Sequence, residues 1–137
     1  MSIVTDKKIL HQISLPTTRE EIERLDLIKR LREATKTAWT KGAGLAAIQI
    51  GIPLRFAWYI FQGKERVLFN PKILKSWGEY IEKEGCLSIP NIWFVIERAY
   101  TIKYVSNGKK KKVSGFEARL IQHEIDHMNG ILLTDIK

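Results

Sequence analysis

The residue types best suited to chemistry lie near the C-terminus, at residues 122–127, which spell QHEIDH. His123 and His127 are four positions apart, so on a helix their imidazoles lie one turn apart on one face and can bind one metal ion. Glu124 follows the first histidine and can reach a water on that metal as a general base. The same spacing also occurs in ordinary helices with solvated or core histidines. The pair therefore predicts a metal site only together with a third ligand.

A catalytic metal site usually has three protein ligands and one position for water. Residues 131–137 contain one carboxylate, Asp135, and no histidine, and His11 is interpreted as an ordinary surface or core histidine. The other candidate is Cys86, the only cysteine, within residues 84–90 (EGCLSIP). A lone cysteine is most often a small core residue, but glycine and proline in this segment predict a loop that can aim the thiol. A thiolate with two imidazoles would suit a first-row transition metal.

A third segment, residues 42–51 (GAGLAAIQIG), is rich in small residues. Its Gly-x-Gly is a weak match to a phosphate loop, because no strand precedes it and no Lys-Ser/Thr closes it. Small residues instead let the backbone approach a ligand closely. Gln49 adds an amide donor where an oxyanion could form.

Taken together, the motifs GAGLAAIQIG, EGCLS and QHEIDH resemble those of the peptide deformylase family, in the same order and with no mismatch at a functional position. The resemblance covers about residues 41–134. It implies one divalent metal per chain, held by Cys86, His123 and His127 with water as the fourth ligand. Fe(II) is favoured by resemblance, while the ligand types also suit Zn(II), Ni(II) or Co(II). The implied substrates are N-formyl-methionyl nascent peptides, which would be hydrolysed to release formate.

The resemblance also implies roles for the neighbouring residues. Glu124 would take a proton from the attacking water and pass it to the departing amine. The Gln49 side-chain amide and the Leu87 backbone N–H would stabilise charge on the formyl oxygen. Gly44 would offer backbone hydrogen bonds to a peptide that lies in a groove as an added strand. The implied substrate-binding residues are Ala43, Gly44, Gly85, Phe116 and Leu120.

Three further positions surround this site. The resemblance also implies that Glu84 pairs with Arg98 and so fixes the segment around Cys86. Arg98 has an alternative interpretation as an exposed charge at a strand end. Trp93 either stacks on the substrate or simply packs.

Two other functional classes fit the motifs less well. An HExxH endopeptidase would normally take a downstream third ligand rather than a cysteine. A catalytically silent, RNA-binding metal module would need neither Glu124 nor Gln49 and would usually close its fourth metal position.

Residue spacing predicts two helices, one before and one after the middle of the chain. Thr18 and Glu21 have capping-box spacing, and apolar residues then recur near the helical period, which predicts one N-terminal helix from about Arg19 to Thr40, stopped by Gly42 and Gly44. A second helix is predicted from Phe116 to about Met128, ended by Gly130.

The middle of the chain predicts strands, because it is rich in aromatic and branched residues bounded by glycine or proline. The expected strands are 54–61, 66–69, 73–82, 100–105 and 110–113. The last two flank Asn107-Gly108, a strong hairpin-turn signal. The order predicts an α+β fold, with mostly antiparallel sheets around a central C-terminal metal-binding helix.

Composition sets the remaining bounds. The chain has 137 residues, which predicts a single catalytic domain over 1–137, and a hydrophobic share of 45% excludes disorder. A single cysteine excludes a disulfide scaffold. No membrane span or signal peptide is predicted, so a cytoplasmic protein is expected, in the host cytoplasm if the protein is of phage origin. A monomer is also expected. The short segment after the metal helix is similar to phage-type members that lack a C-terminal helical extension.

Charge is the last global feature. The net charge is +8, from 23 Lys and Arg against 15 Asp and Glu. The densest run, Lys109 to Lys112, is interpreted as a solvated hairpin tip in preference to a nucleic-acid site. No DNA partner and no membrane partner are expected, and the charge implies only a weak general attraction to ribosomal RNA.

Overall fold

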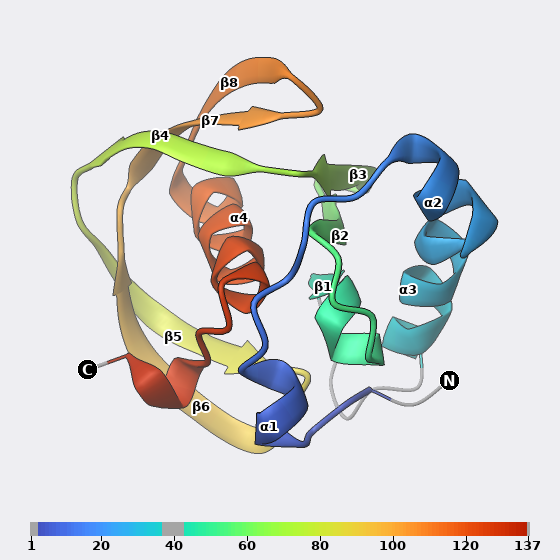
Figure 1. Ribbon diagram of the computed structural model, residues 1–137. Helices are drawn as coiled ribbons and strands as arrows, with labels where there is room; N and C mark the ends of the chain where they lie inside the picture. The colour runs from blue at the N-terminus through green and yellow to red at the C-terminus, as the bar shows by residue number, and fades with distance from the viewer. Residues whose placement is uncertain (1–2, 37–42, 137) are drawn as a thin grey trace.

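The computed structural model describes residues 3–36 and 43–136, where short helices come first, strands follow and one longer helix comes after them (Figure 1). The helices are α1 (Lys7–Leu10), α2 (Arg19–Arg24), α3 (Leu27–Lys36) and α4 (Gly115–Met128), with 3₁₀ turns η1 (Ala47–Ile50) and η2 (Leu133–Asp135). The strands are β1 (Gly44–Ala46), β2 (Phe56–Phe61), β3 (Lys64–Phe69), β4 (Lys72–Trp77), β5 (Tyr80–Cys86), β6 (Ile89–Arg98), β7 (Thr101–Ser106) and β8 (Lys109–Ser114).

The strands form antiparallel sheets with the orders β1-β2-β3, β4-β7-β8 and β5-β6. Helix α4 runs through the middle of the molecule, with β4, β7 and β8 above it and β5 and β6 below it in Figure 1. The predicted α+β architecture, with antiparallel sheets around the C-terminal helix, is confirmed.

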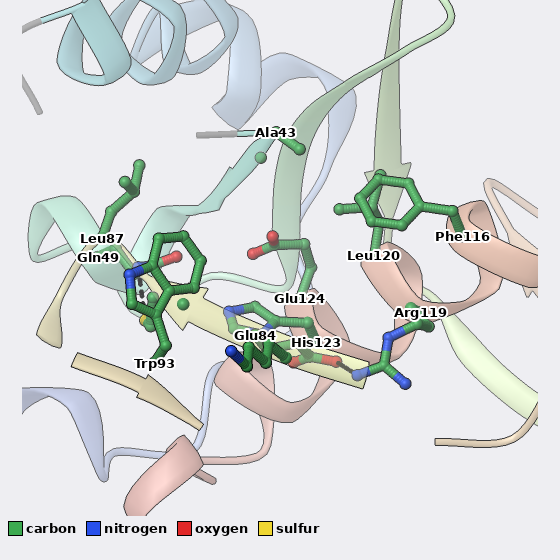
Figure 2. A pocket seen from close by; sticks show the side chains of 14 residues that line it. Ala43, Gln49, Glu84, Leu87, Trp93, Phe116, Arg119, Leu120, His123 and Glu124 are labelled. Carbon is green, nitrogen blue, oxygen red and sulfur yellow. Dashed lines mark hydrogen bonds and ion pairs between the residues drawn. The ribbon is translucent and has the colours of Figure 1, made fainter. Parts of the chain in front are cut away.

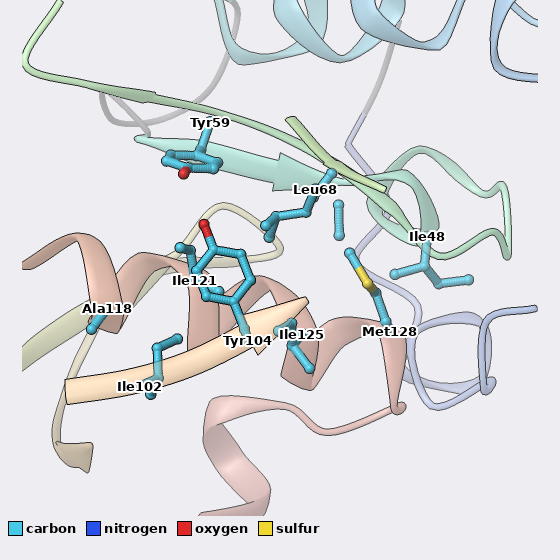
Figure 3. Close-up of a cluster of buried hydrophobic side chains, with 11 residues drawn as sticks. Ile48, Tyr59, Leu68, Ile102, Tyr104, Ala118, Ile121, Ile125 and Met128 are labelled. Carbon is cyan, nitrogen blue, oxygen red and sulfur yellow. The ribbon is translucent and has the colours of Figure 1, made fainter. Parts of the chain in front are cut away.

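The main core forms where α4 meets the sheets. Residues of α4 at helical spacing make an apolar stripe that packs on inward-facing residues of β2, β3 and β7 (Figure 3). The buried members are Ala46, Ile48, Ala57, Tyr59, Leu68, Ile102, Tyr104, Ala118, Ile121, Ile125 and Met128. Burying each large apolar side chain contributes about 1.5–3 kcal/mol. The helix that carries the histidines is therefore held rigidly along its opposite face.

The N-terminal helix prediction is wrong in one respect, because the structure has two helices where one was expected. Thr18 caps α2 as predicted, since its hydroxyl accepts a hydrogen bond from Glu21 N at 3.1 Å. The chain then breaks at Asp26, whose φ of 52° is left-handed. The apolar periodicity of the sequence continues through this break, so the periodicity does not predict it. The predicted end at residues 37–40, with Gly42, lies outside the described residues.

The strand predictions also need correction. The expected strand 73–82 is two strands in different sheets, divided at Gly78, whose φ is 81°. Strands β1 and β6 were not predicted, and β6 contains Pro90, which usually argues against a strand interior. Cys86 ends β5 and does not lie in an extended loop.

The hairpin prediction at Asn107-Gly108 is confirmed, with φ values of 53° and 73° between β7 and β8. Lys109 to Lys112 are exposed, but they form strand β8 and not the hairpin tip. In the described parts of the chain no helix has the length and apolar character needed to cross a bilayer.

Candidate metal centre

Three side chains from two elements converge beside the pocket. Cys86 comes from the end of β5, and His123 and His127 come from α4. The Cys86 Sγ lies 3.4 Å from His127 Nε2, and the two Nε2 atoms are 3.2 Å apart. The three ligand atoms all lie within 4.8 Å of one another.

These distances fit a single metal ion. A tetrahedral ion with bonds of about 2.3 Å to sulfur and 2.05 Å to nitrogen sets S···N at about 3.6 Å and N···N at about 3.3 Å. The ligand types also match, since a thiolate and two imidazoles suit borderline-soft transition metals. The residues present therefore fit one divalent transition metal.

The position of Cys86 follows from an irregularity in the β5-β6 ladder. The register shifts between Gly85 and Cys86, where Gly85 pairs with Trp93 and Cys86 pairs with Ile89. Such a bulge re-aims the next side chain. Gly85 also lies under Trp93, because a Cβ there would meet the indole at 2.7 Å. The glycine thus allows the indole to pack close to the strand while the thiol turns toward α4.

The surroundings of Cys86 favour its thiolate. Burial alone would raise the pKa of the thiol, but His127 and His123 together lower the pKa to about 5. A thiol with that pKa is ionised at neutral pH, which is the form that binds metals.

Glu84 orients the first histidine. Its Oε1 lies 3.0 Å from His123 Nδ1, so Nε2 is left facing the other two ligands. The same carboxylate accepts from Arg98 Nε at 2.9 Å and Nη2 at 2.8 Å. Burial opposes ionisation of Glu84, yet Arg98 and His123 lower its pKa to about 2. Arg98 is only 7% exposed, so its alternative interpretation as an exposed strand-end charge is wrong.

Arg119 is a residue that sequence reasoning missed. Its Nη2 donates to Glu84 Oε2 at 2.6 Å, and the guanidinium also binds the carbonyls of Tyr80, Glu82 and Ile96. It is 2% exposed and joins α4 to both β5 and β6. The sequence does contain one indication of this role: Arg119 lies four residues before His123, which places both residues on one face of a helix.

Gln49 is held from both ends of its amide. Its Oε1 accepts from Ala46 N at 3.0 Å, and its Nε2 donates to Ser88 Oγ at 3.0 Å. Nε2 also lies 3.7 Å from Cys86 Sγ. The donor end of Gln49 therefore points to the cysteine side of the pocket, and Ser88 is a second partner that the sequence did not reveal.

Glu124 lies between the histidines in sequence and lines the pocket (Figure 2). It is 2% exposed, and this burial raises its pKa. Its Oε1 has no hydrogen-bond partner within the described residues. A buried carboxylate with a raised pKa and a free oxygen is suited to accept a proton.

The pocket above these groups is a cavity of about 280 Å³. All the substrate-binding residues expected from the sequence line it, together with Leu87: Ala43, Gly44, Gly85, Phe116 and Leu120. Lys83 and Trp93 line it as well, and Trp93 is 58% exposed. Phe116 stacks on Phe61 at a centroid distance of 6.5 Å, so Phe61 supports the apolar side of the pocket that Phe116 lines.

The remaining candidates lie elsewhere. Asp135 binds His11 Nε2 at 3.1 Å and caps Leu132 N at 2.8 Å. In the described parts of the chain, Asp135 does not belong to the group of converging ligand atoms. His11 is half-exposed, as its interpretation as an ordinary histidine implied.

The chain is similar to known proteins in both its sequence and its fold. The family described as polypeptide deformylase matches residues 1–136. A peptide deformylase of Rhizobium meliloti is 39% identical over 148 aligned positions, which cover 97% of this chain and 82% of the relative. The crystal structure of a probable peptide deformylase from Synechococcus phage S-SSM7 superposes with a TM-score of 0.87 at 33% identity, covering 98% of each chain. An Acinetobacter baumannii peptide deformylase bound to Met-Ala-Ser superposes with a TM-score of 0.82 at 28% identity, covering 98% of this chain and 96% of that one.

Proposed function

Because the chain belongs to the peptide deformylase family, we propose that it removes the N-formyl group from the initiator formyl-methionine of newly made peptides. The observation that carries this proposal is the convergence of Cys86, His123 and His127 beside the pocket that Glu124 lines. Water adds to the formyl carbon, the bond from that carbon to the amide nitrogen breaks, and the products are formate and a peptide with a free amino terminus.

One divalent transition metal per chain, held by Cys86, His123 and His127, supplies a Lewis acid that makes a water molecule acidic near neutral pH. Family resemblance favours Fe(II) in the cell, and the donor set also suits Zn(II), Ni(II) or Co(II). Glu84 keeps the His123 ring turned so that Nε2 remains available as a ligand.

Glu124 is the proposed proton carrier. Its buried carboxylate takes the proton of the attacking water and later gives it to the departing amine. The raised pKa of Glu124 favours the first step, since a stronger base accepts the proton of the water more readily.

Charge that develops on the formyl oxygen needs donors. The Gln49 amide is proposed to supply one, because its carbonyl end is anchored to Ala46 and its NH₂ end faces Cys86. The backbone N–H of Leu87, the residue after the cysteine, is proposed to supply the other. Each such donor contributes on the order of 10²–10³ in rate in well-studied acyl-transfer enzymes.

The peptide is proposed to bind along the pocket as an added strand beside Gly44, with its methionine side chain against apolar residues. The proposed contacts are Ala43, Gly44, Gly85, Phe116 and Leu120, all of which line the cavity. The Acinetobacter relative bound to Met-Ala-Ser supports a peptide that begins with methionine. The proposed enzyme works as a monomeric catalytic domain over residues 1–137, in the cytoplasm where formylated chains emerge.

The test is formate release from formyl-Met-Ala-Ser by metal-loaded protein. Acetyl-Met-Ala-Ser is the matched substrate, because it differs by one methyl group at the reacting carbon. We expect release of formate from the first peptide and much slower release of acetate from the second. A chelator should abolish the activity, and adding Fe(II) or Ni(II) should restore it. Cleavage of internal peptide bonds would indicate an endopeptidase, and a fully loaded protein with no turnover would indicate a silent metal module.

A further inference from the structure

The outer face of the β4-β7-β8 sheet concentrates positive charge around one exposed indole. Ile102 and Tyr104 of β7 point inward to α4, so the alternate positions of β7 and their partners on β4 and β8 lie on the other side of the sheet. On that side Lys103 is exposed, Val105 is partly buried and Thr101 is buried. We name this surface the basic face, and its charged and aromatic residues are Lys72, Lys75, Trp77, Lys103, Lys110 and Lys112. All of these side chains are exposed.

The lysines gather around the ring of Trp77, which is 39% exposed. The ammonium groups of Lys75, Lys103 and Lys112 lie 5.7, 6.0 and 5.5 Å from the ring centroid. Such cation–π contacts hold the charges close to an aromatic surface. One small area thus combines positive charge with an aromatic ring.

This arrangement opposes folding. Lys75, Lys103 and Lys112 are direct cross-strand partners in one row, and like charges placed opposite one another destabilise a sheet. The row has no acidic residue, and in the parts of the chain that the structure describes the ion pairs involve none of the lysines of the basic face. The charge is therefore available to a polyanion.

We propose that the basic face binds single-stranded RNA, with phosphates on the lysines and an unstacked base on Trp77. The lysines meet the electrostatic requirement, because they would release counterions from the RNA backbone. The indole meets the second requirement, because base stacking on an aromatic ring is how proteins bind single strands without sequence preference. The basic face lies on β4, β7 and β8, on the side away from α4 and its histidines (Figure 1). The proposal is thus independent of deformylase chemistry.

Strand β8 provides a matched pair of variants. Lys110 and Lys112 belong to the basic face, whereas Lys109 and Lys111 pair with the inward-facing Ser106 and Tyr104 and project to the other side. Lys110→Gln/Lys112→Gln and Lys109→Gln/Lys111→Gln therefore remove the same charge from the same strand. Binding of a labelled 12-nucleotide single-stranded RNA by metal-loaded protein is measured by fluorescence anisotropy at several salt concentrations.

We expect the Lys110/Lys112 variant to lower the slope of log Kd against log salt by about 1.4, at about 0.7 per lost phosphate contact. The Lys109/Lys111 variant should leave that slope nearly unchanged. Trp77→Ala should weaken binding at least about fivefold, and Trp77→Phe should restore most of it. Formate release from a formyl-Met peptide should stay unchanged in all of these variants, which shows that they are folded.

Three results would overturn the proposal. Equal losses in the two lysine pairs would mean that the charge acts diffusely and the basic face is not a site. A Trp77→Ala variant that binds RNA as tightly as the native protein would exclude stacking of a base on Trp77. Poly-glutamate or phosphatidylserine vesicles that bind as tightly as RNA, with the same dependence on the variants, would assign the face to acidic proteins or to membranes.

Discussion

Gly44 and Glu124 are in such close contact that a Cβ on Gly44 would lie 2.9 Å from Glu124 Oε2. The same atom would also lie 2.9 Å from Tyr59 Cβ and 3.1 Å from the Trp58 carbonyl. These two neighbours belong to β2 and cannot move aside easily. The small residue at this point of β1 therefore allows the carboxylate to lie beside the pocket wall.

Gly44→Ala should lower both activity and stability. Steric overlap of this kind typically costs about 1–3 kcal/mol, and displacing the carboxylate should reduce kcat more than it raises KM. The control is Gly108→Ala in the β7-β8 turn, where φ is 73° and no atom lies within 4 Å. That variant should lose about 1–2 kcal/mol from backbone strain alone. Chemical denaturation and kcat/KM are measured for both, and equal activity in the two would show that Gly44 has no special relation to Glu124.

Glu124→Gln should separate metal binding from turnover. The amide keeps the shape of the side chain and removes its basicity, so metal content should stay near one per chain while turnover falls by about 10²–10⁴. Glu117→Gln is the control, since it makes the same change two turns earlier on α4, where the carboxylate binds the Tyr59 hydroxyl. Elemental analysis, calorimetry with a formyl-Met peptide and formate release are the measurements. A Glu124→Gln variant that keeps its rate or loses its metal would contradict the proposed role.

Cys86→Ser should lose tight metal binding and most activity. A hydroxyl is a far poorer ligand than the thiolate, which the histidines stabilise by lowering the pKa of Cys86 to about 5. Metal content after gel filtration and formate release per chain are the two measurements. Full occupancy with near-normal turnover would remove Cys86 from the ligand set.

Glu84→Gln should weaken both the fold and the metal site. The variant leaves Arg98 and Arg119 with poorer partners, and breaking a buried ion pair costs about 3–5 kcal/mol. Loss of the carboxylate behind His123 should also lower metal affinity by about 10–100-fold. Glu82→Gln is the control on the same strand, because Glu82 is exposed. Titration with metal and urea denaturation are the measurements, and similar behaviour of the two variants would exclude the orienting role of Glu84.

The difference in free energy of unfolding between the native protein and Glu84→Gln should depend on pH. The pKa of Glu84 is about 2 in the folded protein and 4.5 is its ordinary value, so the ionised group stabilises the fold above pH 4.5 and this contribution is lost as pH falls toward 2. At about 1.36 kcal/mol per pH unit, the change is roughly 3 kcal/mol. The two metal-free proteins are compared by urea denaturation between pH 6 and 2.5. A difference that stays constant over this range would show that Glu84 is not held ionised by its neighbours.

Much of the chemistry is readable in the sequence, because its determinants are local. The spacing of His123 and His127 on a helix depends only on residues within one turn of each other. The turn at Asn107-Gly108 depends on left-handed φ values that these residue types tolerate. Gln49 was suggested as an amide donor by its small-residue segment, and its role at the formyl oxygen came from family resemblance.

Other features were decided only by tertiary packing. Cys86 and His127 are 41 residues apart and meet because the bulge at Gly85 turns the end of β5 toward α4. The buried role of Arg119 depends on carbonyls of β5 and β6 that the folded sheet brings to α4. The break at Asp26 interrupts an apolar pattern that local periodicity continues.

Strand β8 illustrates both kinds of feature, those that the sequence predicts and those that depend on tertiary packing. Four consecutive lysines after a tight turn can be read directly from the sequence, and the alternation of a strand places their side chains on opposite sides in turn. The register against β7 then places Lys110 and Lys112 on the same side of the sheet as Trp77. Register reflects which side of the sheet buries its apolar residues, and here that choice is made by Ile102 and Tyr104 packing on α4.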